Sequence, residues 1–491
     1  MTPAQTERTF RLLLYDALAS EAMGTLTTGV FLTGFALALG ASNLAIGVLA
    51  AVPSAVQFLQ FPAVVLVERL RRRRAICAWA AGIGRGFLVA AAMASFLGGT
   101  AGVILLVASI ATYQASAAVA GCAWNSWMRD LVPEREFGRF FGRRAAANTA
   151  VATAFALTGG LLVDHLKSIL TGPAGIAFTG LFLAGAAIGF VGVWLLAITP
   201  DQPMPPVAQR PKMLPLLVLP FRDRNFRRLM AFLASWNFAA NLASPFFAVY
   251  MLRSLGYSMT TVIILTTASQ LSNLAAIGLW GNLIDRFSNK AVLGLSAPLF
   301  LLCTLAWTFT GVEWIQPATF YLLLAIHILM GIATAGVALG SGNIAMKLSP
   351  AGQATAFLAA SSVVSASCAA VAPIIGGLGA DFFAAHELSF GFTWHSDFKT
   401  VRVQVLNFHG WTFFFGIAFL VGLFALHRLS LVQETAGTTN PLLMRDLMME
   451  ARRSVRGLSS VAGLLRVARV PPWLVRQRPM KPADARGTPR H

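Results

Sequence analysis

Charged side chains are scarce in this sequence. Only 12% of its 491 residues are charged and 56% are hydrophobic, whereas a typical soluble domain has about 25% charged residues. The mean hydropathy of the chain is +0.68. This composition excludes an ordinary soluble fold and indicates that lipid solvates most of the protein surface.

Acidic residues are the scarcest of the charged ones. The chain has 19 of them against 38 Lys and Arg, which gives a formal net charge of +19. A basic protein can bind nucleic acid, but here the basic residues lie in alternate loops between apolar runs and in the tail beyond Glu434. That alternation is typical of the cytoplasmic loops of membrane proteins. We therefore predict an integral, multi-pass protein of a bacterial inner or plasma membrane, with the lipid bilayer as partner and no nucleic acid.

The residue patterns of metal sites and enzymes are also missing. The four cysteines are scattered through apolar runs without metal-ligand spacing, so we interpret them as packing residues. They are Cys77, Cys122, Cys303 and Cys368. The glycines of residues 82–86 do not follow a strand, which argues against a phosphate-binding loop. We predict no enzyme activity, no catalytic residues, no metal and no cofactor.

Long apolar runs dominate what is present. Each of twelve runs reaches the roughly 20 residues that a membrane-spanning helix needs, and only helices or closed barrels satisfy every backbone group inside lipid. The runs cover residues 12–39, 43–67, 75–97, 101–124, 145–166, 174–198, 226–252, 258–283, 291–311, 317–344, 354–383 and 409–430. The first run is too long to be the apolar region of a signal peptide. We therefore predict an all-α integral membrane protein with about twelve transmembrane helices.

Proline and charge divide the chain into segments. Seven prolines lie between residues 199 and 225, which predicts a linker because this stretch cannot continue a helix. Basic clusters follow the even-numbered runs, so both termini are predicted to be cytoplasmic. The loop at 385–408 is expected on the other side, as a solvated loop or as a gating or ligand contact. The predicted segments are a cytoplasmic N-terminus (1–11), a first six-helix bundle (12–198), a cytoplasmic linker (199–225), a second six-helix bundle (226–430) and a basic cytoplasmic tail (431–491).

Three pairs of features recur at one spacing along the chain. The members of each pair are 217 residues apart. The pairs are Glu68 with Asp285, Gly159 with Gly376, and Pro133 with Pro350. Both glycines are followed by a second glycine and then by an acid, Asp164 or Asp381, and inside membrane helices such glycine pairs predict a kink together with close packing. A repeat of this kind predicts a duplicated unit.

Residues 281–290 read Gly-Asn-Leu-Ile-Asp-Arg-Phe-Ser-Asn-Lys and connect two apolar runs. This loop resembles the signature loop of the major facilitator superfamily of secondary transporters, although Ser288 and Asn289 stand where that pattern has its second Gly and an Arg. The resemblance implies two pseudo-symmetric six-helix bundles that rock about a site near the middle of the membrane. The glycine pairs resemble, more distantly, a fifth-span motif of drug–proton antiporters.

The resemblance also implies a gating role for the signature loop and its counterpart in the first half. The gating residues would be Glu68, Arg69, Gly281, Asp285 and Arg286. Each acid would dock on the positive N-terminus of a helix in the other half, a contact worth about 0.3–1 kcal/mol. Asp285 would face the fifth span near Ala145, and Glu68 would face the eleventh span near Ala354. These contacts would close the cytoplasmic gate and would break when the cavity opens inward.

Two charged residues are expected deep in the membrane. Glu21 and Arg85 lie roughly 13–15 Å from the cytoplasmic edge of a hydrocarbon core about 30 Å thick, where a charge is costly unless it is partnered or hydrated. They could form a buried ion pair, Glu21 could carry the coupling proton or contact the substrate, or the residues could face lipid. Asp16 lies nearer the edge and is expected to be hydrated or paired with arginines.

Neutral polar residues occur at similar depth, several of them on spans that the resemblance assigns to the central cavity (one, four, seven and ten). The predicted cavity residues are Gln114, Trp236, Asn237, Asn241, Gln270, Asn273 and His327. Each polar one alone could form an interhelical hydrogen bond, worth about 0.6–2 kcal/mol. As a set they favour a water-lined cavity.

These features predict a monomeric secondary active transporter that moves a small solute by alternating access and is coupled to protons. Export of an amphipathic or hydrophobic compound is the first hypothesis, because the cavity spans carry few fixed charges and many aromatics. These aromatics include Trp236, Phe238, Phe246 and Phe247. Uptake of a sugar-like or other polar nutrient is one alternative, suited to the amide side chains. A non-transporting membrane scaffold or assembly factor is another.

Overall fold

The computed structural model describes residues 3–132, 137–170, 172–173, 175–201, 219–311, 318–350, 353–384, 386–396 and 399–434. The tail beyond Glu434 and most of the predicted linker lie outside the described residues. The N-terminal half contains α1 (Pro3–Thr27), α2 (Gly29–Ala38), α3 (Asn43–Ala55), η1 (Val56–Leu59), α4 (Gln60–Leu70), α5 (Arg73–Ala92), α6 (Ala94–Leu97), α7 (Gly99–Leu131), α8 (Phe137–Ile169) and α9 (Ile176–Ile198). The C-terminal half contains α11 (Arg224–Val249), the π-helical turn η3 (Tyr250–Ser254), α12 (Met259–Arg286), α13 (Asn289–Ala306), η4 (Trp307–Phe309), α14 (Thr319–Leu348), α15 (Ala354–Ala384) and α16 (Trp411–Ser430).

These elements form the predicted helical fold. In the described part of the chain, ten helices are long and apolar enough to cross a membrane. The remaining two predicted spans correspond to α1 with α2, and to α11 with η3. The first span is interrupted where Thr28 is extended and Gly29 has a φ of +58°, a conformation that glycine adopts without strain. The helical membrane fold is therefore confirmed.

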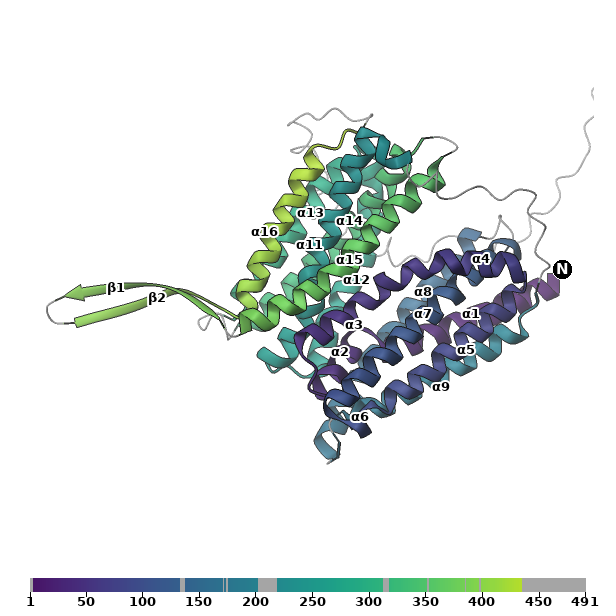
Figure 1. The fold of residues 1–491 in the computed structure, drawn as a ribbon, viewed down its shortest axis with the longest axis horizontal. Coiled ribbons are helices and arrows are strands. Elements are labelled where there is room, and N and C mark those ends of the chain that lie inside the picture. The colour runs from purple at the N-terminus through teal and green to yellow at the C-terminus, as the bar shows by residue number, and fades with distance from the viewer. Residues whose placement is uncertain are drawn as a thin grey trace, which may run out of the picture.

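The sequence did not predict the strands. Residues predicted to form a solvated loop contain the strands β1 (Glu387–Ser396) and β2 (Lys399–His409). They pair antiparallel, from Glu387 opposite His409 to Ser396 opposite Lys399. The hairpin projects from the bundle between α15 and α16 (Figure 1).

Short polar side chains mark where several helices begin. Ser42 accepts a hydrogen bond from the Ala45 amide at the start of α3, and Ser258 accepts one from the Thr261 amide at the start of α12. Asp223 caps α11 in the same way. Such caps satisfy amide groups that have no partner inside the helix, and each is worth about 1 kcal/mol.

Within the described residues, the apolar core joins the two halves at one end. One continuous buried cluster contains Phe31 and Phe178 of the N-terminal half together with Phe246 and Met259 of the C-terminal half. Away from this cluster the N-terminal half has a separate cluster around Trp127, and the C-terminal half has two, one that includes Phe226 and one around Trp280. The two halves accordingly meet at one end and diverge towards the other (Figure 1).

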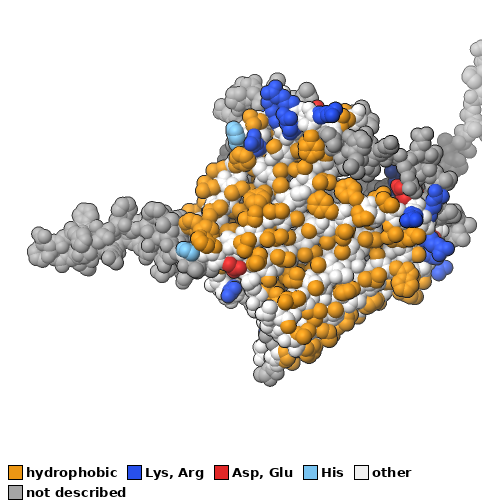
Figure 2. All heavy atoms as spheres, in the orientation of Figure 1, with side chains coloured by type: hydrophobic (Ala, Val, Ile, Leu, Met, Phe, Trp, Pro, Cys, Tyr) orange, Lys and Arg blue, Asp and Glu red, His pale blue; other side chains and the backbone are white. Residues whose placement is uncertain are grey.

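Basic residues gather at the diverging end. We call it the arginine-rich end, because it carries Arg69–Arg74, Arg143, Arg286 and Arg428 at the ends of their helices. The joined end, at residues 39–42, 255–258 and 410, is called the opposite end. Figure 2 shows Lys and Arg at the tips of both halves, with a broad hydrophobic surface between the tips and the opposite end. Large apolar side chains are exposed, among them Trp79 (75% exposed), and are suited to contact with lipid.

Candidate functional site

Asp164 holds the two halves together at the opposite end. It lies near the end of α8 in the N-terminal half, and its carboxylate accepts hydrogen bonds from the first amides of α12 in the C-terminal half. The distances are 2.9 Å from Met259 N and 2.8 Å from Thr260 N, and the Thr260 hydroxyl donates a third bond at 2.6 Å. A carboxylate in this position satisfies unpaired amides and interacts favourably with the helix dipole.

Asp381 makes the equivalent contact in the other direction. It lies near the end of α15, and its carboxylate accepts bonds from Asn43 N at 3.2 Å and Leu44 N at 3.1 Å, at the start of α3. The side-chain amide of Asn43 donates to it at 2.8 Å. Asp381 is Asp164 displaced by the repeat spacing of 217 residues, and the same spacing separates Asn43 from Thr260. The duplicated unit therefore builds two related latches, which we call the opposite-end latches.

The paired glycines allow the backbones to approach at these latches. A Cβ atom added to Gly377 would lie 2.5 Å from the Asn43 carbonyl oxygen, and one added to Gly160 would lie 3.3 Å from the Thr260 Cα. The predicted close-packing role of the glycine pairs is confirmed by these distances. Residue types with a side chain would push α15 away from α3.

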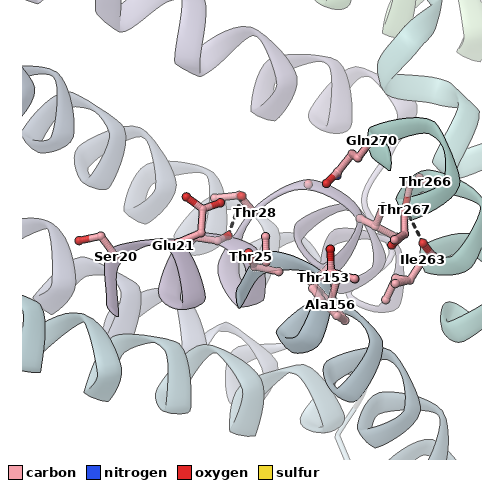
Figure 3. Close-up of a pocket in the computed structure, with 15 residues that line it drawn as sticks. Ser20, Glu21, Thr25, Thr28, Thr153, Ala156, Ile263, Thr266, Thr267 and Gln270 are labelled. Atoms are coloured by element: carbon pink, nitrogen blue, oxygen red, sulfur yellow. Dashed lines mark hydrogen bonds between the residues drawn. The ribbon is translucent and has the colours of Figure 1, made fainter. Parts of the chain in front are cut away.

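A pocket of about 410 Å³ lies between the halves. Its walls come from α1, α2 and α8 of the N-terminal half and from α12 of the C-terminal half. Figure 3 shows Glu21 and Thr28 on one side and Thr266, Thr267 and Gln270 on the other. The polar lining residues are Ser20, Glu21, Thr25, Thr28, Thr153, Thr266, Thr267 and Gln270. A volume of this size is within the usual range of small-molecule sites, about 300–1,000 Å³.

A cluster of four charged residues adjoins the pocket inside the N-terminal half. Arg85 is 7% exposed, donates to the Ala81 carbonyl at 3.2 Å and interacts electrostatically with Asp16, which is 4% exposed. Arg144 interacts with Asp16 and with Glu21, and its guanidinium lies 4.3 Å from the centre of the Trp124 ring. Each of these two acids and two bases lies near a charge of the opposite sign, which offsets part of the free energy that its burial costs.

Glu21 faces the pocket from this cluster. It is half-buried, and the side-chain amide of Asn148 on α8 donates to its Oε2 at 3.1 Å. The sequence suggested an ion pair between Glu21 and Arg85; in the structure the carboxylate that interacts with Arg85 is Asp16. Asp16 lies near Arg85 and Arg144, but the described residues show no hydrogen bond or ion pair between them, so its pairing with arginines stays a prediction.

The other predicted cavity residues are spread along the C-terminal half and α7. Only Gln270 joins Glu21 in the pocket lining. Asn237 and Asn241 donate side-chain N–H groups to the carbonyls of Leu233 and Asn237 on their own helix, both at 2.8 Å. Asn273 donates to the Gly331 carbonyl at 3.2 Å, which is an interhelical bond. Gln114 is half-buried on α7.

His327 and the aromatic residues pack inside the C-terminal half. His327 is 6% exposed, with Nδ1 2.8 Å from the Leu323 carbonyl oxygen and its ring edge-on to Trp307. Phe247 stacks on Trp307 with ring centres 4.4 Å apart. Trp236 packs against Phe300. The geometry therefore gives these side chains a packing role in this state.

Sequence reasoning missed most of the pocket. Its wall is built largely of hydroxyl side chains, among them Thr25, Thr28, Thr153, Thr266 and Thr267. The available signal was the clustering of threonines at residues 25–28 and 266–267 inside otherwise apolar runs. Asn148 and Arg144 were missed because the fifth span was assigned no cavity role.

Comparison with known proteins identifies the fold. The family model of the Major Facilitator Superfamily matches residues 229–476, just over half of the chain. The chain belongs to the major facilitator superfamily. It is an integral, multi-pass membrane protein of a superfamily of transporters. No curated protein matches its sequence.

Solved structures share the superfamily fold at low sequence identity. A mutant of the nucleoside transporter NupG has a TM-score of 0.66 at 14% identity, covering 87% of this chain and 100% of that one. A bacterial homologue of the iron transporter ferroportin, in an inward-facing state, has a TM-score of 0.64 at 14% identity, covering 87% and 99%. A bacterial homologue of the human lysosomal transporter Spinster, inward-facing and unoccupied, has 0.60 at 15%, covering 92% and 98%. These likenesses show the fold alone.

The superfamily's signature loop lies at the arginine-rich end, between α12 and α13. Asp285 and Arg286 are exposed there, and Glu68 is half-buried near the end of α4. Arg69 lines a separate hollow of about 870 Å³ between α4, α5 and α7. Gly281 has open space where a Cβ atom would lie. The halves diverge at this end, so docking of Asp285 near Ala145 and of Glu68 near Ala354 stays a prediction for the closed state.

Proposed function

We propose that this protein is a secondary transporter that moves a small polar solute across the membrane by alternating access, coupled to protons. The observation that carries the proposal is the pair of opposite-end latches, Asp164 on α12 and Asp381 on α3. They close one end of a two-bundle molecule whose other end diverges, with a polar pocket between the bundles.

The latches are suited to repeated opening. Each consists of a few hydrogen bonds from a carboxylate to a helix N-terminus, an interaction worth about 0.3–1 kcal/mol at exposed positions and up to about 2 kcal/mol when partly buried. A solute that binds one state better than the other supplies enough free energy to shift an equilibrium of that size. The basic loops favour a cytoplasmic location for the arginine-rich end, and we therefore propose that this state faces inward, with both termini cytoplasmic.

The pocket favours a polar solute over a hydrophobic one. The hypothesis of amphipathic export was based on aromatic residues, but Trp236, Phe246 and Phe247 are buried among other aromatics of the C-terminal half. The pocket instead presents hydroxyl groups, an amide and a carboxylate. Polar groups in a water-accessible site bind solutes that replace their hydrogen bonds to water.

Glu21 is the residue that we assign to proton coupling. It lines the pocket and adjoins the buried Asp16–Arg85–Arg144 cluster. A carboxylate between solvent and a low-dielectric interior changes protonation when its surroundings change. Closing the arginine-rich end would change the surroundings of Glu21 directly.

Paired latch variants test alternating access. Asp164→Asn weakens the opposite-end latch and should lower the fraction of molecules open at the arginine-rich end. Asp285→Asn weakens the predicted closed-state latch and should raise that fraction. The measurement is labelling, by a membrane-impermeant thiol reagent, of single cysteines placed in the pocket wall and approached from each side. Identical labelling of both variants and the parent would refute the proposal.

Proton coupling is tested separately by Glu21→Gln. The variant should lose most of the flux driven by a pH gradient in proteoliposomes, because the amide cannot release a proton. The control is Glu7→Gln, whose side chain is 73% exposed in a surface pair with Arg11. Unaltered gradient-driven flux in Glu21→Gln would remove the coupling role, and absence of flux in the parent across polar and hydrophobic panels would favour the scaffold alternative.

A further inference from the structure

The pocket is dominated by hydrogen-bond acceptors. Three threonine hydroxyls in its wall already donate their hydrogen to backbone carbonyls: Thr28 to Gly24 at 2.7 Å, Thr153 to Thr149 at 2.9 Å and Thr266 to Ile263 at 3.1 Å. A hydroxyl has one hydrogen and two lone pairs, so these oxygens can only accept a bond from a solute.

Ser20 is committed in the same way. Its hydroxyl donates to the Asp16 carboxylate at 3.5 Å, so it offers no hydrogen to a solute. Gln270 carries an amide, which provides donors as well as an acceptor, and the hydroxyls of Thr25 and Thr267, which make no hydrogen bond within the described residues, can donate as well as accept. The balance of the wall is therefore towards lone pairs, and a solute with many N–H or O–H groups satisfies it better than a solute with many acceptors.

The charge of the lining has one sign. Among the described residues that line the pocket, Glu21 is the ionisable one. The nearby arginines make other contacts: Arg85 donates to the Ala81 carbonyl, and the Arg144 guanidinium lies over the Trp124 ring. Asp16, Arg85 and Arg144 are absent from the lining. The charged group that a solute contacts in the pocket is therefore the carboxylate of Glu21.

We infer that the solute is a small organic cation rich in hydrogen-bond donors, such as an amine-bearing sugar or a short polyamine, with its positive nitrogen at Glu21. The inference rests on the proposed transport function and names its substrate class. Asn148 donates to Glu21 Oε2 and thereby orients the carboxylate. Charge-assisted N–H···O bonds to a carboxylate are roughly twice as strong as neutral ones, while an anion would be repelled by the same group.

The experiment measures binding of charge-matched probes to the purified full-length protein at one pH and without a gradient. Glucosamine, glucose and glucuronate share one ring scaffold; putrescine, 1,4-butanediol and succinate share one linear scaffold. Binding by titration calorimetry should rank the cation first and the anion last on at least one scaffold. A neutral or anionic probe that binds as tightly as its cationic counterpart, or a panel in which no cation binds at millimolar concentration, would overturn the inference.

Variants locate the binding. Glu21→Gln keeps an acceptor for Asn148 but removes the charge, and should weaken cation binding by about tenfold or more, leaving the neutral probes little changed. Thr153→Val removes one acceptor oxygen from the wall and should weaken cationic and neutral probes alike. Its matched control is Thr149→Val, four residues earlier on α8, half-buried, bonded to its own helix and outside the lining.

The two proposals fail separately. If the charge ranking and its loss in Glu21→Gln are found, but the latch variants leave accessibility unchanged, then the pocket chemistry is correct and alternating access is not. If accessibility alternates but the cations show no advantage, then the substrate class is wrong and the transport proposal stands.

Discussion

Among the described residues of this acid-poor chain, four acidic side chains accept hydrogen bonds from the first amides of a helix. They are Asp164 at α12, Asp381 at α3, Asp223 at α11 and Glu434 at α13. Only Asp223 belongs to the loop next to its own helix, as a conventional cap does. The other three come from distant parts of the chain, so each one joins separate elements as well as satisfying amides.

Glu434 fastens the last described residues to the arginine-rich end of the C-terminal half. Its carboxylate accepts bonds from Lys290 N at 2.8 Å, from the Asn289 side chain at 2.9 Å and from Lys347 Nζ at 2.9 Å. Its side chain is 3% exposed. Burial alone would raise the pKa of Glu434, but the bonds from Lys347, Lys290 and Asn289 outweigh it and hold the pKa below its ordinary value.

The pH dependence of stability follows from that shift. Because the folded pKa is lowered, Glu434 stabilises the fold above its ordinary pKa of about 4.3, and this contribution is lost as the pH falls through the folded value. Glu434→Gln should therefore cost about 1–3 kcal/mol near neutral pH and less at pH 3. Thermal unfolding of parent and variant at several pH values measures this difference. The control is Glu7→Gln, and a gap that persists unchanged at pH 3 would contradict the ionic account.

At the scale of elements, the contact between α3 and α15 depends on glycine. Gly377→Ala would place a Cβ atom 2.5 Å from the Asn43 carbonyl oxygen and 2.8 Å from the Leu44 Cα, both backbone atoms that cannot rotate away. Gly379 is two residues along the same helix, and its Cβ would lie 3.6 Å from the Phe414 ring, an ordinary contact. A Cβ atom therefore has too little space at Gly377 and enough space at Gly379.

We therefore expect Gly377→Ala to separate the halves at the opposite end and Gly379→Ala to leave them in place. In a helix, Ala is favoured over Gly by roughly 0.5–1 kcal/mol, so the control should be neutral or slightly more stable. Accessibility of a single cysteine at the start of α3, measured with the impermeant thiol reagent, should rise in the first variant only. Equal accessibility in both would show that the interface yields without opening.

Helix positions could be predicted from the sequence because lipid imposes a length and an apolar composition on every span. The repeat spacing was readable for a similar reason, since Asp164 and Asp381 stand out in apolar surroundings. Their role was not readable, because the amide partners of Asp164 lie 95 and 96 residues away in the other half. The hairpin at 387–409 was not predicted, because the charged residues of this segment favoured a solvated loop and the pairing of its strands is seen only in the structure.

At the scale of the whole molecule, the site was only partly predictable. Depth along a helix was enough to find Glu21, whereas the direction in which a helix faces depends on packing between bundles. This is why Asn237 and His327, at suitable depth, bond within their own helices, while Thr153 and Thr266 reach the pocket. The duplicated fold determines which helices contact each other, and the side chains at those contacts determine which groups line the pocket.

A disulfide across one latch tests whether the whole molecule must come apart at the opposite end during each cycle. In a variant whose four native cysteines are replaced, Asp164→Cys with Thr260→Cys puts two thiols where a carboxylate oxygen and a hydroxyl lie 2.6 Å apart. Oxidation should stop transport in proteoliposomes and a reductant should restore it, because α8 and α12 belong to different halves. The control pair is Ser95→Cys with Thr179→Cys, whose hydroxyls are in hydrogen-bond contact inside the N-terminal half; its oxidation should leave the rate unchanged. A disulfide keeps α8 and α12 together throughout the cycle, whereas the hydrogen bonds of the latch can break and re-form. Full transport by the oxidised latch pair would therefore mean that the halves do not need to separate there.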